Sequence, residues 1–341
     1  MKKAWLPSII IIVALLCHPF FALADTAPLR ITVSVPGPRN ISYLPIDLIP
    51  RIGADKAEGA QIQLLHTGGG GVALSNLMNR NADFAVAGMP AAMSLRVNGG
   101  KVTVIAAVDD APLFVLMVRA DLKGQVRRIA DLKGKVVGVN TSSLSSKTTS
   151  QQLAELVLKT DGVSTDMVRL MPAGQSWLEQ SSILESKTAD AIMGDEPFAS
   201  RLLAENKVFF LANLADPKTS EKIPGANFLH AALETREETL TADPRLVAKM
   251  VAILRRTLQW VAAHTPEQIV DALDIADKEE RAALIAGLKK YPNLYSKDGR
   301  LSARQLRETG LFFHGASEGN AAAQALKIEI MIADKWAGNK D

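Results

Sequence analysis

The chain of 341 residues has almost no cysteine, few aromatic residues and no excess of charge. Cys17 is the only cysteine and lies in a segment expected to be removed, so disulfides, zinc–thiolate sites and cysteine nucleophiles are excluded from the mature protein. Aromatic residues make up 5%, and plentiful aliphatic residues are typical of parallel sheets covered by helices. The 39 Lys and Arg residues fall to 37 without Lys2 and Lys3, against 36 Asp and Glu. This balance gives no support for nucleic-acid binding, which uses a concentrated basic surface.

Residues 1–24 have the three parts of a secretory signal peptide. Two lysines precede an apolar run from Ile9 to Leu16, and Ala22-Leu23-Ala24 forms a small-x-small cleavage site. We therefore expect cleavage after Ala24 and release into the periplasm. A retained anchor is the alternative, although the apolar run is shorter than the roughly 20 residues of a spanning helix. Lipidation at Cys17 is a further alternative, but two leucines precede it where the lipoprotein motif has a small residue. No later segment is apolar enough to span a membrane, so the mature protein is expected to be soluble.

Strand-like and helix-like patterns alternate over the first two thirds of the mature chain. Helix-like stretches at 43–52, 72–80, 89–98, 148–159, 176–186 and 196–206 separate strands expected at 29–35, 60–66, 82–87, 102–108, 113–118, 136–139, 167–171, 189–193, 208–211 and 228–233. This spacing predicts βαβ units with mainly parallel strands.

Only helical patterns follow Pro244. The strongest is an apolar stripe with a 3.6-residue period from Arg245 to His264, and further helices are expected from Pro266 and at 284–288, 303–313 and 321–336. About 317 mature residues are too many for one core. The order of elements predicts two lobes, one interrupted by the other: lobe 1 from 25–116 and 215–341, and lobe 2 from 117–214.

Three segments resemble a known family. The segment Ile129–Val139 (IADLKGKVVGV) resembles its D-L-K-G-K-x-V-G-V entry to the second lobe, Lys187–Pro197 (KTADAIMGDEP) resembles a turn ending in E-P, and Asn81–Gly88 (NADFAVAG) resembles a first-lobe strand. Together they resemble the periplasmic solute-binding proteins for nitrate, sulfonates, taurine and thiamine-pyrimidine precursors. The first loop, Pro36–Asn40, departs from the hydrophobic loop common in that family, so the resemblance does not indicate a ligand.

The resemblance implies an α/β fold of the two-lobed periplasmic-binding-protein type (type II). Each lobe would be a mostly parallel sheet flanked by helices, with a C-terminal helical extension. It also implies a small-molecule ligand held in an interlobe cleft and delivered to an ABC permease of the inner membrane with its cytoplasmic ATPase. We expect a monomer with no nucleic-acid partner. A ligand sensor that presents its bound state to a receptor needs the same clamp and stays an alternative.

A glycine loop, Thr67 to Gly71, joins a strand to a helix. Its free N–H groups and the helix dipole favour an anion or a carbonyl oxygen. The loop has neither the Gly-Lys-Ser/Thr of a P-loop nor the GxGxxG of dinucleotide sites. Ligands of open α/β sheets bind at the carboxyl ends of strands, so we predict ligand contacts from Thr67, Gly68 and Gly69. A turn required only for backbone shape is the alternative.

Three more candidates also follow strands. Thr141 and Ser142 are the first hydroxyls after the strand at 136–139, and helix capping is their alternative role. Glu196 is placed to accept a hydrogen bond from a ligand amine or ring N–H, or else to stabilise a helix N-terminus.

First-lobe strand ends supply the remaining candidates. Gly88 would let the backbone approach a ligand, and Asp109 would contact the ligand or form a turn. Arg39 would pair with a sulfonate or carboxylate, or be solvated. Arg39, the glycine loop and the hydroxyls favour an organic anion such as a sulfonate or carboxylate. Glu196 and Asp109 keep a nitrogen heterocycle or amine as the alternative.

Catalysis is not expected. Enzymes with this scaffold in related families depend on cysteine, and the sequence has no GxSxG nucleophile elbow. The histidines show no metal-ligand spacing, so neither a metal nor a cofactor is expected.

Overall fold

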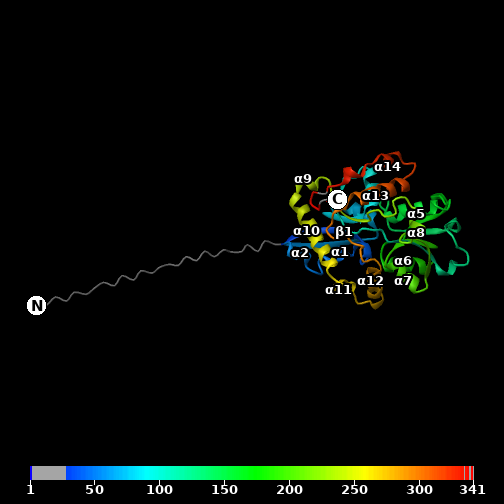
Figure 1. The fold of residues 1–341 in the computed structure, drawn as a ribbon, viewed down its shortest axis with the longest axis horizontal. Coiled ribbons are helices and arrows are strands. Elements are labelled where there is room, and N and C mark those ends of the chain that lie inside the picture. Colours follow the sequence, from blue (N-terminus) through cyan, green and yellow to red (C-terminus); the bar gives the residue numbers. More distant parts are fainter. Residues whose placement is uncertain (2–27, 334, 338, 341) are drawn as a thin grey trace.

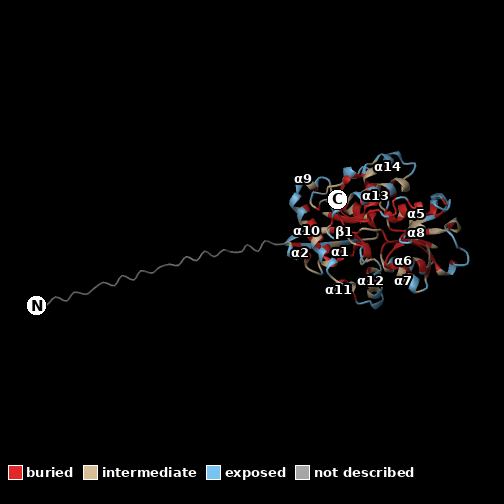
Figure 2. Ribbon diagram, viewed as in Figure 1, coloured by how far each residue is buried: buried red, intermediate tan, exposed pale blue. Residues whose placement is uncertain are grey.

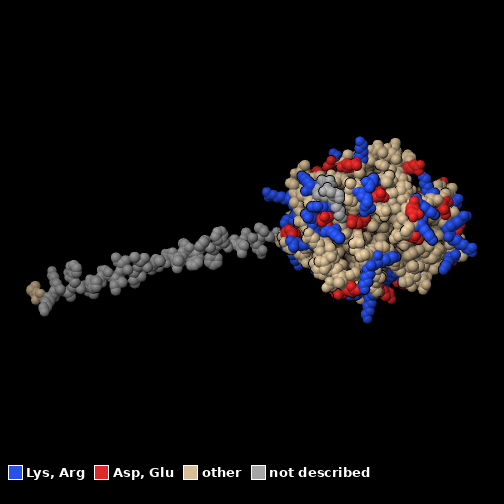
Figure 3. Space-filling view, in the orientation of Figure 1, with Lys and Arg blue, Asp and Glu red and all other residues tan. Residues whose placement is uncertain are grey.

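The computed structural model describes Met1 and residues 28–333, 335–337 and 339–340. Apart from Met1, the expected signal peptide and its cleavage after Ala24 lie outside the described residues. Within the described part, no helix is both long enough and apolar enough to cross a membrane. On the face shown in Figure 3, basic and acidic side chains are interspersed, in keeping with their nearly equal numbers.

The first sheet has five strands in the order β2-β1-β3-β10-β4. Strand β1 runs parallel to β2 and β3, whereas β10 lies antiparallel between β3 and β4. The chain therefore leaves this sheet after β4 and returns much later to insert β10. The strands are β1 (Leu29–Pro36), β2 (Ala60–Thr67), β3 (Phe84–Gly88), β4 (Val102–Ala107) and β10 (Ala231–Arg236).

The second sheet repeats this topology in the order β7-β6-β8-β5-β9. Strand β6 is parallel to β7 and β8, and β5 lies antiparallel between β8 and β9. The strands are β5 (Phe114–Arg119), β6 (Val136–Val139), β7 (Arg169–Pro172), β8 (Ala191–Asp195) and β9 (Val208–Asn213). Two mostly parallel sheets confirm the expected α/β class.

Helices cover both faces of each sheet, which explains why nearly every central strand residue is buried (Figure 2). One face of the first sheet packs on α10, and the other packs on α3, α4 and α13. The second sheet lies between α5 on one face and α6 with α7 on the other. The bounds are α3 (Gly70–Met78), α4 (Met89–Val97), α5 (Thr149–Lys159), α6 (Trp177–Glu185), α7 (Phe198–Ala204), α10 (Pro244–Ala262) and α13 (Ala303–Ala316).

The remaining elements are short or belong to the C-terminal extension. A separate apolar cluster joins α1, α11 and α12, and α11 lies at the lower edge of the molecule in Figure 1. The bounds are α1 (Leu44–Leu48), α2 (Ala54–Ala57), α8 (Pro217–Ser220), α9 (Thr239–Ala242), α11 (Pro266–Ala272), α12 (Lys278–Lys290), α14 (Ala321–Ala325), β11 (Leu301–Ser302) and β12 (Asn339–Lys340). We call the first sheet with α1–α4 and α9–α14 lobe 1, and the second sheet with α5–α8 lobe 2.

Two local expectations differ from the structure. The helix expected over 321–336 ends at Ala325, because Ile332 instead pairs with Val104 at the edge of the first sheet. The lobe boundary expected at 116/117 falls inside β5, whose Phe114 is already paired with Asp195 of the second sheet. In the connection from β9 back to β10, Phe228 stacks on Phe312 of α13 with ring centroids 4.2 Å apart. Phe312 also packs in the apolar cluster of the second sheet, so α13 contacts both lobes.

Candidate functional site

The loops at the carboxyl ends of the two sheets lie against each other. The backbone N–H of Thr141 in lobe 2 donates to Gly68 O in lobe 1 at 3.0 Å. A Cβ atom on Gly69 would lie 2.5 Å from Thr141 O, closer than Cβ atoms approach other atoms, so only glycine fits there. On α5, Gln152 Nε2 donates to Pro90 O across the same junction at 2.9 Å. The two lobes are therefore closed on each other, and Gly68, Gly69 and Thr141 lie together at this junction.

Asp195 ends β8 at the centre of this junction and is 1% exposed. Its Oδ2 accepts a hydrogen bond from Asn40 Nδ2 of lobe 1 at 2.6 Å, and another from Gln175 of lobe 2. Burial raises the pKa of Asp195 to about 6, even though surrounding amides, including those of Asn140 and Gln180, favour the charged carboxylate. A buried acceptor is thus held between the lobes by donors from both of them.

A buried tyrosine–histidine pair forms the lobe 1 side of the junction. Tyr43 Oη lies 3.1 Å from His230 Nε2. Burial lowers the pKa of His230 to about 3, so its imidazole is neutral at physiological pH. Burial also raises the pKa of Tyr43, with further contributions from the charges of Asp195 and Asp109, so the phenol stays protonated. The tautomer of His230 decides which atom of this pair donates, and its other ring nitrogen, Nδ1, has no hydrogen-bond partner within the described residues.

Asp109, a predicted site residue, is fully buried next to this pair. Its Oδ1 accepts a hydrogen bond from Ala231 N at 2.8 Å, and its Oδ2 makes no well-aligned hydrogen bond in the described part of the chain. Burial raises its pKa well above the usual value. At Gly88, also predicted, a Cβ would come within 2.0 Å of Thr149 Oγ1 and 3.2 Å of His230 Cε1. Gly88 of lobe 1 thus packs closely against Thr149 of lobe 2, beside His230.

Several buried polar atoms at this junction make no well-aligned hydrogen bond, although Ser42 lies beside Asp109, and Asn140 and Gln180 lie beside Asp195. An unpaired buried polar group costs roughly 1–3 kcal/mol, so such atoms mark positions where the donors and acceptors of a solute can be matched. Among the described residues they are Ser42 Oγ, Asp109 Oδ2 and His230 Nδ1 from lobe 1, and Asn140 Oδ1, Thr149 Oγ1, Asp195 Oδ1 and the Gln180 amide from lobe 2. We refer to these seven residues, with Asn40, Tyr43 and Gln175, as the Asp195 cluster.

Four predicted residues make local contacts instead. The guanidinium of Arg39 pairs with Glu280 of α12 at 2.8 Å, and its side chain is 41% exposed. The hydroxyl of Thr67 donates to Gly69 O within the same loop at 3.1 Å. Ser142 Oγ accepts from Thr148 N at 3.1 Å, and the Glu196 carboxylate accepts from Ser200 N and Oγ at 3.0 and 2.8 Å. The Glu196 bonds satisfy N–H and O–H groups in the first turn of α7, as its helix-stabilising alternative expects, whereas the N-cap of α5 is Thr148 and Ser142 lies beside it.

The sequence did not single out most of the Asp195 cluster. Asp195 itself lies within the segment Gly194–Pro197 that carried the family resemblance, but the neighbouring Glu196 was chosen. The alternation of a strand gives the available signal, because Asp195 and Met193 face the same side of β8 whereas Glu196 has already left the strand. For Tyr43 and His230, which are 187 residues apart, no local pattern exists.

The comparisons with known proteins agree with this architecture. The family model described as NMT1/THI5 like matches residues 56–269, which is more than half of the chain. No curated protein matches the chain by sequence.

Solved structures show the same fold along nearly the whole chain. A protein from Bordetella bronchiseptica RB50 has a TM-score of 0.80 at 20% identity, covering 91% of this chain and 96% of that one. The alkanesulfonate-binding protein SsuA from Xanthomonas axonopodis pv. citri, bound to MOPS, has a TM-score of 0.70 at 15% identity, with 90% and 99% covered. The periplasmic nitrate-binding protein NrtA from Synechocystis PCC 6803 has 0.68 at 10%, with 91% and 87% covered. Identities this low show a shared fold alone.

Proposed function

The chain belongs to the NMT1/THI5-like family, and from this premise we propose that it is a periplasmic binding protein that captures a small solute between its lobes for an ABC importer. The observation that carries the proposal is the Asp195 cluster, in which buried polar atoms of both lobes face one junction without well-aligned hydrogen bonds. A two-lobed protein that closes on a ligand needs such a junction. The permease and its ATPase are the proposed partners.

Binding rather than catalysis suits the chemistry of this cluster. His230, with a pKa of about 3, takes up no proton near neutral pH and is a poor general base there. The hydroxyl that lies next to a base in the cluster is the Tyr43 phenol, 3.1 Å from His230 Nε2. Burial raises the pKa of Tyr43, so this phenol is not activated as a nucleophile.

A solute with N–H donors fits the cluster best. Asp195 Oδ1 and Asn140 Oδ1 would each accept an N–H, and His230 Nδ1 would donate to the solute or accept from it according to the tautomer of the ring. In the described residues, the only buried Lys or Arg is Arg119, which ends β5 and pairs with Asp121 and Asp190. We therefore propose a neutral or cationic nitrogen compound, the class that the sequence left as its alternative.

An organic anion is the second candidate, because helix N-termini favour negative charge. Helices α3, α4 and α5 begin at Gly70, Met89 and Thr149, next to the interlobe contacts. The relatives SsuA and NrtA are also named for alkanesulfonate and nitrate. An anion beside Asp195 would require that carboxyl to be protonated, however, which separates the two candidates.

A thermal-shift screen tests the solute class. We expect a primary amine, an aminopyrimidine or a related N–H compound to raise the melting temperature, because a ligand that binds only the native state stabilises it. Sulfonates, carboxylates and nitrate in the same screen test the second candidate. If no class raises the melting temperature, the proposed function is wrong.

The pH dependence of the affinity distinguishes the two candidate solute classes independently of the screen. An N–H solute needs ionised Asp195, so its Kd should rise about tenfold for each pH unit below about 6 and stay constant above it. An anion needs protonated Asp195, so its Kd should instead rise about tenfold for each unit above 6. Calorimetric titrations between pH 4.5 and 8 decide between the two slopes. A flat profile would mean that Asp195 does not contact the solute.

A further inference from the structure

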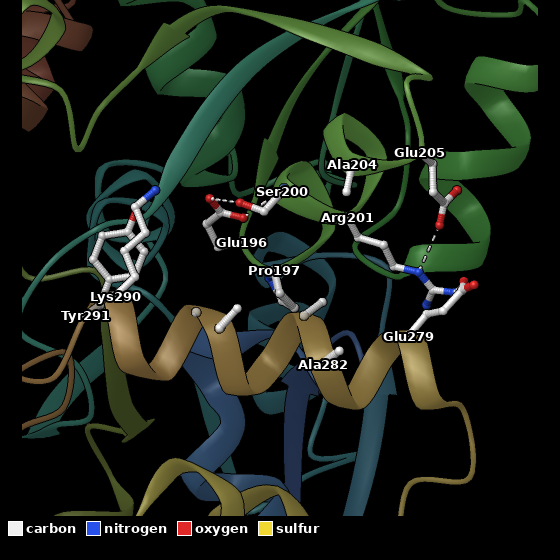
Figure 4. A pocket seen from close by; sticks show the side chains of 13 residues that line it. Glu196, Pro197, Ser200, Arg201, Ala204, Glu205, Glu279, Ala282, Lys290 and Tyr291 are labelled. Carbon is white, nitrogen blue, oxygen red and sulfur yellow. Dashed lines mark hydrogen bonds and ion pairs between the residues drawn. The ribbon is translucent and has the colours of Figure 1, made fainter.

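A cavity lies between α7 of lobe 2 and α12 of lobe 1, apart from the Asp195 cluster (Figure 4). Its volume is about 450 Å³, within the range of roughly 300–1,000 Å³ that is usual for small-molecule sites. One wall is formed by Pro197 and Ala204 at the two ends of α7, and the facing wall is formed by α12. Each lobe therefore contributes one side.

Contacts around Ile41 and Glu196 separate this cavity from the Asp195 cluster. Ile41 N donates to Glu196 O at 3.4 Å, and a Cβ on Gly287 of α12 would lie 2.8 Å from Ile41 Cδ1. Glu196 is 2% exposed, and its carboxylate accepts hydrogen bonds from the backbone N and the hydroxyl of Ser200. No residue of the Asp195 cluster lines the cavity.

The wall formed by α12 is apolar along its length and basic at one end. Small residues at consecutive turns of one helix face form its floor, namely Ala282, Ala283, Ala286 and Gly287. At the C-terminal end, the Nζ of the exposed Lys290 lies 5.1 Å from the ring centroid of Tyr291. The Tyr291 hydroxyl, beside this ammonium group, raises the pKa of Lys290, and the charge of Glu196 in the same cavity adds to the effect.

At the opposite end of the cavity, the charge of the basic residue is neutralised by carboxylates of the protein. Arg201 of α7 is 10% exposed and pairs with Glu205, Asp277 and Glu279 at 3.1 to 3.3 Å. Its positive charge is therefore compensated by three carboxylates, whereas Lys290 makes no salt bridge within the described residues and interacts electrostatically with one carboxylate, that of Glu196. The cavity therefore has an apolar middle part and a cationic end, where Lys290 supplies the charge and Tyr291 a phenol hydroxyl.

We propose that this cavity is a second binding site, for a medium-chain carboxylate with its head group on Lys290 and Tyr291. Its alkyl chain would lie along the small residues of α12. From Ala282 to Lys290 the helix rises about 12 Å, at 1.5 Å for each residue, which suits a chain of about eight carbons. A carboxylate there contacts both lobes, so it stabilises their closed arrangement in preference to an open one.

Calorimetric titration of the full chain with sodium octanoate, below its micellar concentration, tests the site. We expect saturable one-to-one binding, weakened about tenfold or more by Lys290→Gln, because a charge-assisted hydrogen bond is lost. The matched control is Lys289→Gln. It removes the same charge one residue away, where the lysine pairs with Glu267 outside the cavity, and it should bind octanoate like the wild type.

Filling the cavity gives a second, uncharged test. Ala286→Phe places a ring over the floor and should abolish octanoate binding, whereas Ala322→Phe on the exposed face of α14 should not. Equal loss in the Lys289 and Lys290 variants, or undiminished binding by Ala286→Phe, would each overturn the proposal. None of these outcomes bears on solute capture at the Asp195 cluster.

Discussion

Gly69→Ala is expected to weaken solute binding about 100-fold while leaving both lobes folded. The added Cβ would lie 2.5 Å from the O and 2.7 Å from the N of Thr141, and both are backbone atoms that no rotamer change can move. The φ angle of Gly69, 167°, is extended backbone that alanine adopts without strain. The clash is therefore relieved only if the lobes separate. A wedge that disfavours the closed state by about 3 kcal/mol lowers the apparent affinity by about that factor.

Calorimetry with the solute found by thermal shift measures this loss, and small-angle scattering shows whether the solute still compacts the protein. Gly124→Ala is the matched control, because its added Cβ meets no atom within 4 Å. Wild-type affinity in Gly69→Ala would mean that the solute binds without the observed contact between Gly69 and Thr141.

Asp195→Asn is expected to raise stability at pH 8 and to weaken solute binding about 10- to 100-fold. The folded pKa of Asp195, about 6, lies above its ordinary value of 3.8. The carboxyl therefore stabilises the fold fully below about pH 4, and this contribution is lost as the pH rises through 6. The loss amounts to about 3 kcal/mol, because each pKa unit corresponds to about 1.4 kcal/mol.

Asparagine has nearly the same shape and does not ionise, so the variant avoids that loss at pH 8. Some of the gain is offset, because the charge-assisted hydrogen bonds from Asn40 and Gln175 become neutral ones. Thermal unfolding between pH 4 and 8 should show a flatter profile than that of the wild type. The exposed Asp161→Asn serves as the control and should change neither stability nor binding. A variant that is less stable at pH 8, or that binds normally, would remove Asp195 from the proposed site.

Periodicity and composition predicted most of the fold. The strands at 29–35, 60–66 and 136–139 were placed within a residue of β1, β2 and β6, since buried aliphatic runs between helical patterns are unambiguous. The last helix was wrong beyond Ala325, because a tertiary contact between Ile332 and Val104 replaces local helix propensity there.

The candidate site was only partly predictable. Strand-end reasoning selected Gly68, Gly69 and Thr141, because the carboxyl ends of parallel strands are ligand sites in open sheets. The structure brings these three residues together at the interlobe junction, and their contact with a solute stays a prediction. The partners of Asp195 and His230 lie 155 and 187 residues away, at Asn40 and Tyr43, so no local pattern marks them. The positions of strand ends can be predicted from a sequence. The pairing of side chains from two lobes cannot, because it arises only in the folded, closed protein.

Native mass spectrometry of protein purified gently from cells tests the central claim most directly. The account predicts one additional mass of a small solute on the wild type and on Gly124→Ala, and its loss from both Gly69→Ala and Asp195→Asn. Removal of the solute by buffer exchange and its return on titration would show reversible, non-covalent capture. Retention of the same mass by both cleft variants, or no retained or titratable solute on the wild type, would contradict capture between the lobes.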